Sequence, residues 1–328
     1  MRALLLVALL LMVAGCGGSG SGTADRGGAA AADAGTARAA DPNPTAASGS
    51  QGGADPQSAS HSPAASNSQR AADSPPAADA PLPRGQAAIA PALAQTAGGL
   101  EAEIRRWLRS HPGVDAKPPD AVTLYALFQQ RIYRYLRLHP ALAGQVIAAM
   151  PARLRSQARD NVAAGTSLYR LTPKKPPKTQ PPIRIGPAEA PGRLLAWYRD
   201  AQRRFGIRWQ VLAAINFVES SFGRLRNHSY AGAQGPMQFI PGTWSTYGLG
   251  GDVRDPHDAI MGAANYLHAS GAPANYQRAI HSYNPSPLYV DAIVRYARQM
   301  QRNAGRFYAY WSWQVFARGE RRLSGPGL

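Results

Sequence analysis

Apolar residues recur at three- and four-residue spacing along most of the second half of the chain, which is the period of an amphipathic helix. Between residues 193 and 303 this spacing predicts helices over 193–205, 208–222, 255–270 and 287–302. No stretch there alternates apolar and polar residues convincingly over the length of a strand. The pattern therefore predicts a mostly α-helical domain over residues 193–303.

A second helical region, residues 100–171, precedes this domain. Its apolar stripe is formed by Leu124, Leu127, Phe128, Ile132, Tyr135 and Leu136. Because no chemical motif accompanies the stripe, we interpret residues 100–171 as a small helical accessory segment. Residues 172–192 are rich in proline and predict an extended connector, either free or laid across the surface of the last domain. Residues 304–328 form an aromatic C-terminal tail, in which residues 307–316 are expected to make a short strand or to pack.

The N-terminus carries the features of an export signal. Arg2 precedes an apolar run, residues 3–13, that is too short to span a bilayer but has the length of a signal-peptide core. The run ends in "VAGC", and Cys16 is the only cysteine of the chain. This ending resembles the lipobox of bacterial lipoproteins, which implies a signal peptide over residues 1–16 and lipidation of Cys16. The alternative is an ordinary secreted protein with a cysteine there by chance.

Residues 17–99 consist largely of Ala, Gly, Ser, Pro and Asp, a composition that buries too little apolar surface to fold. We interpret them as a long disordered tether. The tether holds six acidic and four basic residues, and the whole chain carries +17, of which Arg2 supplies one charge, so residues 100–328 carry about +18. Such a basic region favours a polyanionic partner, and for an exported protein that partner is envelope material rather than nucleic acid.

Glu219 lies among apolar residues near the end of the predicted helix 208–222. Leu212, Ile215 and Glu219 fall on one helix face, so the carboxyl points toward the core side. Burial and the negative end of the helix dipole both disfavour the carboxylate and raise its pKa. A neutral acid near pH 7 is suited to general acid catalysis. The alternative is a glutamate at a helix end whose carboxyl reaches water.

Two polar stretches follow Glu219. The first, residues 228–244, is rich in glycine and proline, which predicts tight turns that bring the backbone close to a ligand. There, Gln238 offers two donors and an acceptor to a sugar amide or hydroxyl. In the second stretch, Tyr283 and Asn284 end a helical run just before Pro285. A phenol can hydrogen-bond a carboxyl group, and an amide suits an N-acetyl group.

Four motifs, "NFVESSFG", "GAQGPMQFIPGTW", "DPHDAIMGAANYL" and "HSYNPS", occur in this order. Together they resemble the lytic transglycosylases with a lysozyme-like fold, most closely the membrane-bound B type of lytic murein transglycosylase. The resemblance implies a lysozyme-like domain over residues 193–303 with Glu219 as catalytic acid and base. Pro236 and Ser282 replace a leucine and an alanine that are usual in the family, at supporting positions. The substrate-binding residues that the resemblance implies are Ser229, Met237, Gln238, Tyr266, Tyr283 and Asn284.

The resemblance also implies a reaction. The family cleaves the β-1,4 bond between N-acetylmuramic acid and N-acetylglucosamine and forms 1,6-anhydromuramic ends, because the C6 hydroxyl of the sugar attacks the anomeric carbon in place of water. On this interpretation Gln238, Ser229 and Asn284 position the sugars, and Tyr283 holds Glu219 in place. Met237 and Phe239 either wall the cleft or simply pack the core of their loop.

Two other functions fit the same sequence. A hydrolytic muramidase of this fold would use a second carboxylate, for which Asp252 and Asp258 are candidates. A non-catalytic cell-wall-binding lipoprotein would use the same cleft as a lectin does. The three-residue spacing of Asp252, Asp255 and Asp258 does not fit a calcium loop. We therefore expect no metal and no cofactor, and a lipid-anchored, extracytoplasmic monomer that acts on peptidoglycan glycan strands.

Overall fold

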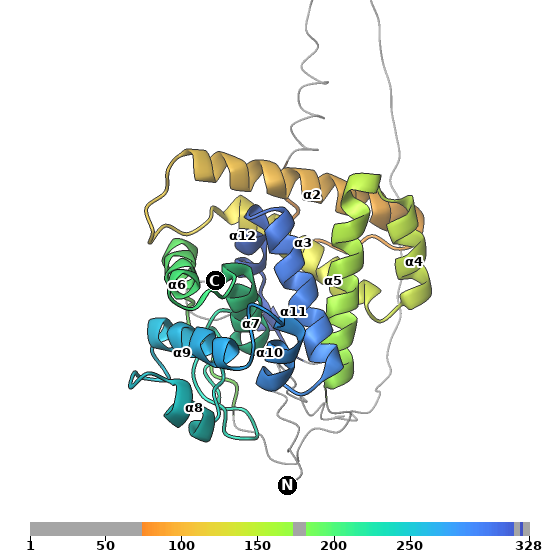
Figure 1. The fold of residues 1–328 in the computed structure, drawn as a ribbon. Coiled ribbons are helices and arrows are strands. Elements are labelled where there is room, and N and C mark those ends of the chain that lie inside the picture. Colours follow the sequence, from red (N-terminus) through yellow and green to blue (C-terminus); the bar gives the residue numbers. More distant parts are fainter. Residues whose placement is uncertain (1–73, 173–181, 318–321, 324–328) are drawn as a thin grey trace, which may run out of the picture. The chain divides into compact units, whose positions relative to one another are not determined.

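A computed structural model describes residues 74–172, 182–317 and 322–323, and in these ranges the chain is mostly helical, as the periodicity predicts (Figure 1). Two short strands, β1 (Val315–Phe316) and β2 (Arg322–Leu323), pair antiparallel near the C-terminus. The helices are α2 (Gln86–Arg109), α3 (Asp120–Leu136), α4 (Pro140–Ala149), α5 (Ala152–Leu171), α6 (Pro191–Phe205), α7 (Trp209–Ser220), α8 (Pro241–Tyr247), α9 (Pro256–Ala269), α10 (Tyr276–Tyr283), α11 (Pro287–Arg302) and α12 (Gly305–Trp311).

Helix α2 includes residues 86–99, so the prediction that the disordered tether extends to residue 99 was wrong. The alanines of this stretch are strong helix formers. Ile89, Leu93 and Leu100 add an apolar stripe that is buried. Helix α2 packs on α3 and α4, and it crosses the top of the view in Figure 1. The alanine-rich composition that predicted disorder thus becomes a helix where leucine and isoleucine appear at helical spacing.

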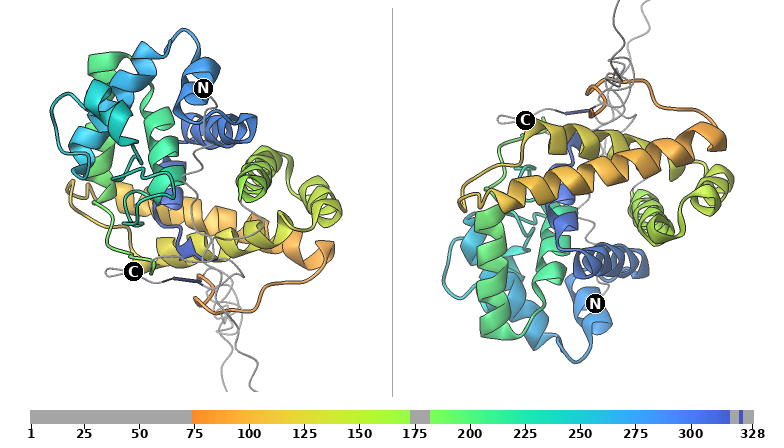
Figure 2. Two further views of the ribbon diagram at one scale, coloured as in Figure 1. Left: turned by 90° about the horizontal axis from the view of Figure 1, so that it is seen from below. Right: turned by 90° about the horizontal axis from the view of Figure 1, so that it is seen from above.

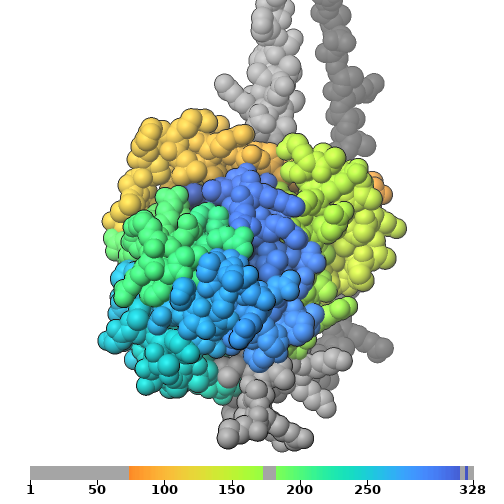
Figure 3. All heavy atoms as spheres, in the orientation of Figure 1, coloured from red at the N-terminus to blue at the C-terminus, as the bar shows by residue number. Residues whose placement is uncertain are grey.

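The accessory helices pack directly on the rest of the described chain. Helix α11 lies between α5 on one side and α7 on the other, with α5 its most extensive neighbour. The two further views in Figure 2 show the same arrangement. In Figure 3 the yellow-green atoms of the accessory helices lie directly against the blue atoms of the C-terminal helices. Helix α11, which follows Tyr283 and Asn284, therefore packs against another helix on each of two sides.

The aromatic C-terminal region completes the core. Residues 305–311 form α12, and of the expected strand over residues 307–316 the structure shows Val315 and Phe316 as β1. Tyr310 and Trp313 surround Phe217 of α7, with ring centroids 5.4 and 5.7 Å away. These buried rings fix the helix that carries Glu219.

The described part of the connector lies across the surface of the last domain. Ile185 forms an antiparallel bridge with Leu225. On either side of this bridge the amide of Gly186 donates to the carbonyl of Arg224, and the amide of Arg226 donates to that of Arg184, each at 2.9 Å. The connector therefore holds the chain that directly follows the Glu219 motif.

No helix in the described ranges is long and apolar enough to cross a membrane. The expected signal peptide, Cys16 and the first part of the tether lie outside the described residues.

Candidate active site

Glu219 occupies the last turn of α7 and is buried, with 2 % of its surface exposed. The helix ends because Ser221, Phe222 and Gly223 all adopt left-handed backbone conformations. Burial raises the pKa of Glu219 from 4.5 to about 8, although a hydrogen bond from Tyr289 acts in the opposite direction. The carboxyl is therefore neutral near pH 7, as its position in the sequence predicts.

The hydroxyl of Tyr289 donates to Oε1 of Glu219 at 2.6 Å. Oε2 has no hydrogen-bond partner among the described residues. An unsatisfied buried oxygen is costly in a folded protein and is typical of a functional site. One oxygen of the acid is thus anchored and the other is left for a ligand.

A tight turn lies beside the end of α7. Gln234 pairs with Phe239, and the amide of Gln238 donates to the carbonyl of Gly235 at 3.1 Å. Gly235 has φ +73°, and a Cβ there would overlap the carbonyl oxygen of Val253. Only glycine fits this position, because both the backbone conformation and the close approach exclude a side chain.

Ser220 joins the turn to the helix. Its hydroxyl donates to the carbonyl of Pro236 at 2.5 Å and accepts from the amide of Gly223 at 2.8 Å. The side-chain amide of Asn216 donates to the same carbonyl at 3.1 Å. Ser220 therefore fixes the turn over residues 235–238. Because the acceptor is the backbone carbonyl of Pro236, this bond does not depend on which side chain stands at position 236.

Gln238 lies in this turn with a left-handed backbone and is buried. Its side-chain nitrogen donates to the carbonyls of Gly235, at 3.0 Å, and Asn227, at 3.3 Å. These two bonds hold the orientation of the amide. Gln238 is thus a preset group in a loop, which suits recognition of a polar ligand.

Tyr283 does not hold Glu219 through a hydrogen bond to its carboxyl, so that expectation was wrong. The Tyr283 hydroxyl donates to the carbonyl of Met237 at 2.7 Å. Burial raises the pKa of Tyr283 well above its usual value, and the nearby charge of Glu219 adds to the shift. Tyr283 lies near the acid but stabilises the turn, and Tyr289 makes the direct contact.

Little in the sequence points to Tyr289. It begins an apolar stripe on α11 with Ile293, Tyr296 and Met300, which is typical of plain core packing. A fully buried phenol needs a hydrogen-bond partner, and this requirement is the one signal that points to Tyr289.

The other expected substrate-binding residues differ in their surroundings. Met237 is fully buried, which favours its interpretation as core packing, whereas the half-buried Tyr266 lies with its ring 5.7 Å from that of Tyr283. Asn284 is buried directly after α10. The hydroxyl of Ser229 accepts from the amide of Ala233 at 3.0 Å and closes the loop before the turn.

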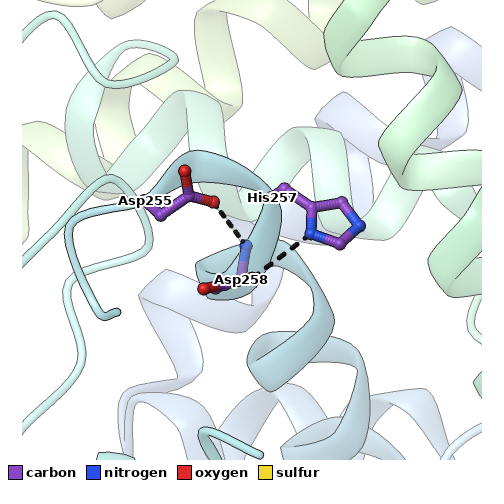
Figure 4. Close-up of side chains that lie close together, drawn as sticks. All are labelled: Asp255, His257 and Asp258. Atoms are coloured by element: carbon purple, nitrogen blue, oxygen red, sulfur yellow. Dashed lines mark hydrogen bonds and ion pairs between the residues drawn. The ribbon is translucent and has the colours of Figure 1, made fainter. Parts of the chain in front are cut away.

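Asp255, His257 and Asp258 cluster at the start of α9 (Figure 4). Asp255 caps the helix by accepting from the amide of Asp258 at 2.9 Å, as its position before Pro256 predicts. Asp258 accepts from the amide of Asp252 at 3.0 Å and lies 3.3 Å from His257. Capping and local turns account for the cluster, which by itself does not indicate a metal site.

Among residues 74–172, 182–317 and 322–323, no second carboxylate hydrogen-bonds to Glu219. The shift in the pKa of Glu219 comes from burial and Tyr289, with no contribution from another acid in the described residues. Asp252 and Asp258 are used by the loop before α9. The geometry is that of a single buried acid beside a fixed turn.

Residues 197–304 match the family of transglycosylase SLT domains. The matched range runs from within α6 to the end of α11 and contains Glu219, Gln238 and Tyr289. It supports a lytic transglycosylase that acts on peptidoglycan, with a lysozyme-like domain, and it does not separate the membrane-bound B type from its relatives. Comparison with curated proteins and with solved structures gave no match.

Proposed function

We propose that this protein cleaves the β-1,4 bond between N-acetylmuramic acid and N-acetylglucosamine in peptidoglycan and leaves 1,6-anhydromuramic ends. The observation that carries the proposal is the state of Glu219, which is buried, neutral near pH 7 and has one free oxygen. The match to transglycosylase SLT domains supports the substrate class.

In the first step Glu219 donates its proton to the glycosidic oxygen, and the C1–O bond breaks. The acetamido oxygen of the muramic residue stabilises the electron-poor C1. In the second step the Glu219 carboxylate takes the proton of the C6 hydroxyl, whose oxygen forms the new bond to C1. Glu219 is protonated again at the end, so one carboxyl serves both as acid and as base, and no water enters.

This mechanism explains why one acid is sufficient. An ordinary glycosidase needs a second carboxyl group to activate water or to attack the sugar. Asp252 and Asp258, the two candidates for a second carboxylate, accept hydrogen bonds from backbone amides of the loop before α9, and the proposal therefore takes the internal hydroxyl as nucleophile. Burial keeps water from the carboxyl and strengthens its electrostatic effect.

We assign the polar groups near the acid to sugar binding. Gln238, Ser229 and Asn284 position the N-acetyl and hydroxyl groups, and Tyr266 lies along the sugar face. Met237 supports the turn from inside, and Tyr283 holds the carbonyl of Met237.

Product analysis tests the proposal. Purified glycan strands digested with the protein are expected to yield muropeptides lighter by one water than those made by a hydrolase, as read by mass spectrometry. Glu219→Gln is expected to abolish cleavage and to retain binding to sacculi. Reducing ends in place of anhydro ends would identify a muramidase, and absence of cleavage by the folded parent protein would identify a wall-binding protein.

We also propose that the protein acts as a lipid-anchored monomer of the membrane-bound B type. The lipid anchor rests on Cys16 and its "VAGC" context, and the type rests on the four motifs between residues 216 and 286. If residues 17–73 act as a flexible tether, these roughly 60 residues have an end-to-end distance of about 40 Å, which lets an anchored enzyme reach glycan away from its membrane. Cys16→Ser is expected to move the protein from the membrane fraction to the soluble fraction, and an unchanged distribution would remove the anchor.

A further inference from the structure

Helix α11 has two opposite faces with different partners. Tyr289, Ile293, Tyr296 and Met300 form a buried face. Asp291, Arg295, Arg298 and Arg302 repeat the same spacing two residues later, so at about 3.6 residues per turn they lie on the opposite face. The buried face meets Glu219 through Tyr289 and α7 through the contact of Tyr296 with Phe217, at 5.0 Å.

The polar face of α11 is covered by α5, which lies outside the matched transglycosylase range. The hydroxyl of Ser167 donates to Asp291 at 2.8 Å, and Arg295 donates to the other oxygen of Asp291 at 2.8 Å. Asp291 lies only two residues after Tyr289, so Ser167 fixes the first turn of α11 where Tyr289 begins its contact with the acid.

Asp160 of α5 fixes the remainder of the same face. Its side chain is 4 % exposed and accepts from Arg295 at 3.0 Å and from Arg298 at 3.1 Å. Gln299 also donates to it. Burial alone would raise the pKa of Asp160, but the bonds from Arg298, Gln299 and Arg295 outweigh it and hold the pKa below its usual value. A buried charge with this many partners fixes the two helices in one register.

Ser167 and Asp160 lie on the same face of α5, seven residues apart. Their bonds hold α11 from behind, at two points along its length. Since α11 is one continuous helix, movement of its outer face changes the position of the Tyr289 hydroxyl on its inner face.

We infer that Ser167 and Asp160 are positioning residues for the acid: from the accessory helix α5 they hold α11 so that Tyr289 donates to Glu219. This inference rests on the proposed function, because it gives α5 a role in the same reaction. It makes the accessory segment part of the catalytic unit.

The test compares Ser167→Ala and Asp160→Asn with Thr166→Val in the full-length chain. Thr166 is the matched control, because its hydroxyl donates to the carbonyl of Val162 within α5 at 2.9 Å and has no hydrogen bond to α11 in the described part of the chain. Circular dichroism and thermal melting establish that each variant is folded at the assay temperature. Ser167→Ala removes one hydroxyl, so it carries the test where Asp160→Asn does not fold.

Misplacing a catalytic contact by a fraction of an ångström is costly, so we expect Ser167→Ala to lower kcat by about threefold to tenfold with little change in KM. We also expect the basic limb of the pH profile of kcat/KM to move to higher pH, because the Tyr289 hydrogen bond that lowers the pKa of Glu219 is weakened. Thr166→Val is expected to match the parent protein in both measurements.

A double-mutant cycle separates positioning from general stability. If Ser167 acts through Tyr289, Ser167→Ala lowers kcat by less than about twofold when Tyr289→Phe is already present. Full multiplication of the two effects, or a Ser167→Ala profile equal to that of Thr166→Val, would overturn the inference. Cleavage by Glu219→Gln would instead remove the proposed function itself, whatever the α5 variants do.

Discussion

The hydroxyl of Tyr289 lies 2.6 Å from Oε1 of Glu219, although the two residues are 70 positions apart in the chain. The contact joins the end of α7 to the first turn of α11. Among the described residues, this hydrogen bond lowers the pKa of Glu219 against the larger effect of burial. The balance between burial and this hydrogen bond sets the pH range in which the acid is protonated.

Tyr289→Phe removes the donor and leaves the ring in place. We expect the pKa of Glu219 to rise, so the basic limb of the kcat/KM profile moves to higher pH. Losing a bond to an ionisable group costs about 1.5 to 3 kcal/mol, which corresponds to roughly a tenfold to hundredfold loss of kcat. Tyr296→Phe is the control, since it removes a hydroxyl from the same buried face of α11 more than one turn away. Equal profiles for the two variants would contradict the role of Tyr289.

Burial of Glu219 also makes the stability of the fold depend on pH. The folded state keeps a proton up to about pH 8 that the unfolded chain releases above about pH 4.5, so the free energy of unfolding falls as pH rises between these values. Glu219→Gln removes this dependence, so we expect the variant to be more stable than the parent at pH 9 by a few kcal/mol and much closer to it at pH 5. Thermal melting across this range measures the difference.

Glu101→Gln is the control for that experiment, because Glu101 lies near the surface, where it forms an ion pair with Arg105 at 3.6 Å. We expect its melting curves to follow those of the parent protein at each pH. A constant difference between Glu219→Gln and the parent from pH 5 to pH 9 would mean that Glu219 is not buried as a neutral acid.

Much of the helical fold and the burial of the acid could be predicted from the sequence. The apolar spacing around Glu219 is regular, and a residue inside such a stripe is directed to the core. The capped start of α9 was equally clear, because Asp255 and Pro256 are typical of a helix N-terminus. These features depend on neighbours in the chain, which the sequence displays.

What the sequence could not provide are contacts between distant segments. Nothing near Tyr289 indicates a partner on α7, and Tyr283 had the better local context because it ends a helix beside Asn284. Composition misassigned residues 86–99 for a related reason. Their alanines become ordered because Ile89 and Leu93 are buried where α2 packs on its neighbouring helices, a packing that composition does not contain.

Two glycines near the site allow the cost of a steric clash to be separated from the cost of a left-handed backbone. Gly235 and Gly232 have φ of +73° and +79°, but only a Cβ at Gly235 would overlap the Val253 carbonyl, whereas nothing lies within 4 Å of one at Gly232. We expect Gly232→Ala to cost about 1 to 2 kcal/mol from the left-handed backbone alone. Gly235→Ala is expected to destabilise the turn much more and to abolish cleavage. Chemical denaturation and activity measure both effects, and equal costs would contradict the close approach.

Asn227 links the connector to the turn that carries Gln238. Its side-chain oxygen accepts from the amide of Arg184 at 2.7 Å, and its side-chain nitrogen donates to the carbonyl of Pro182 at 2.9 Å. Its own carbonyl accepts from the side chain of Gln238 at 3.3 Å. The connector therefore supports a residue to which we assign sugar binding.

Asn227→Ala removes both bonds to the connector and leaves the carbonyl on a less restrained loop. Each exposed bond is worth about 0.5 to 1.5 kcal/mol, so we expect KM for glycan strands to rise by about threefold to tenfold, with a smaller change in kcat. Arg184→Ala is the control, because it removes a side-chain bond to the Arg226 carbonyl but keeps the amide that Asn227 uses. A loss confined to kcat would assign Asn227 to the chemistry of the acid, and an unchanged KM would separate the connector from substrate binding.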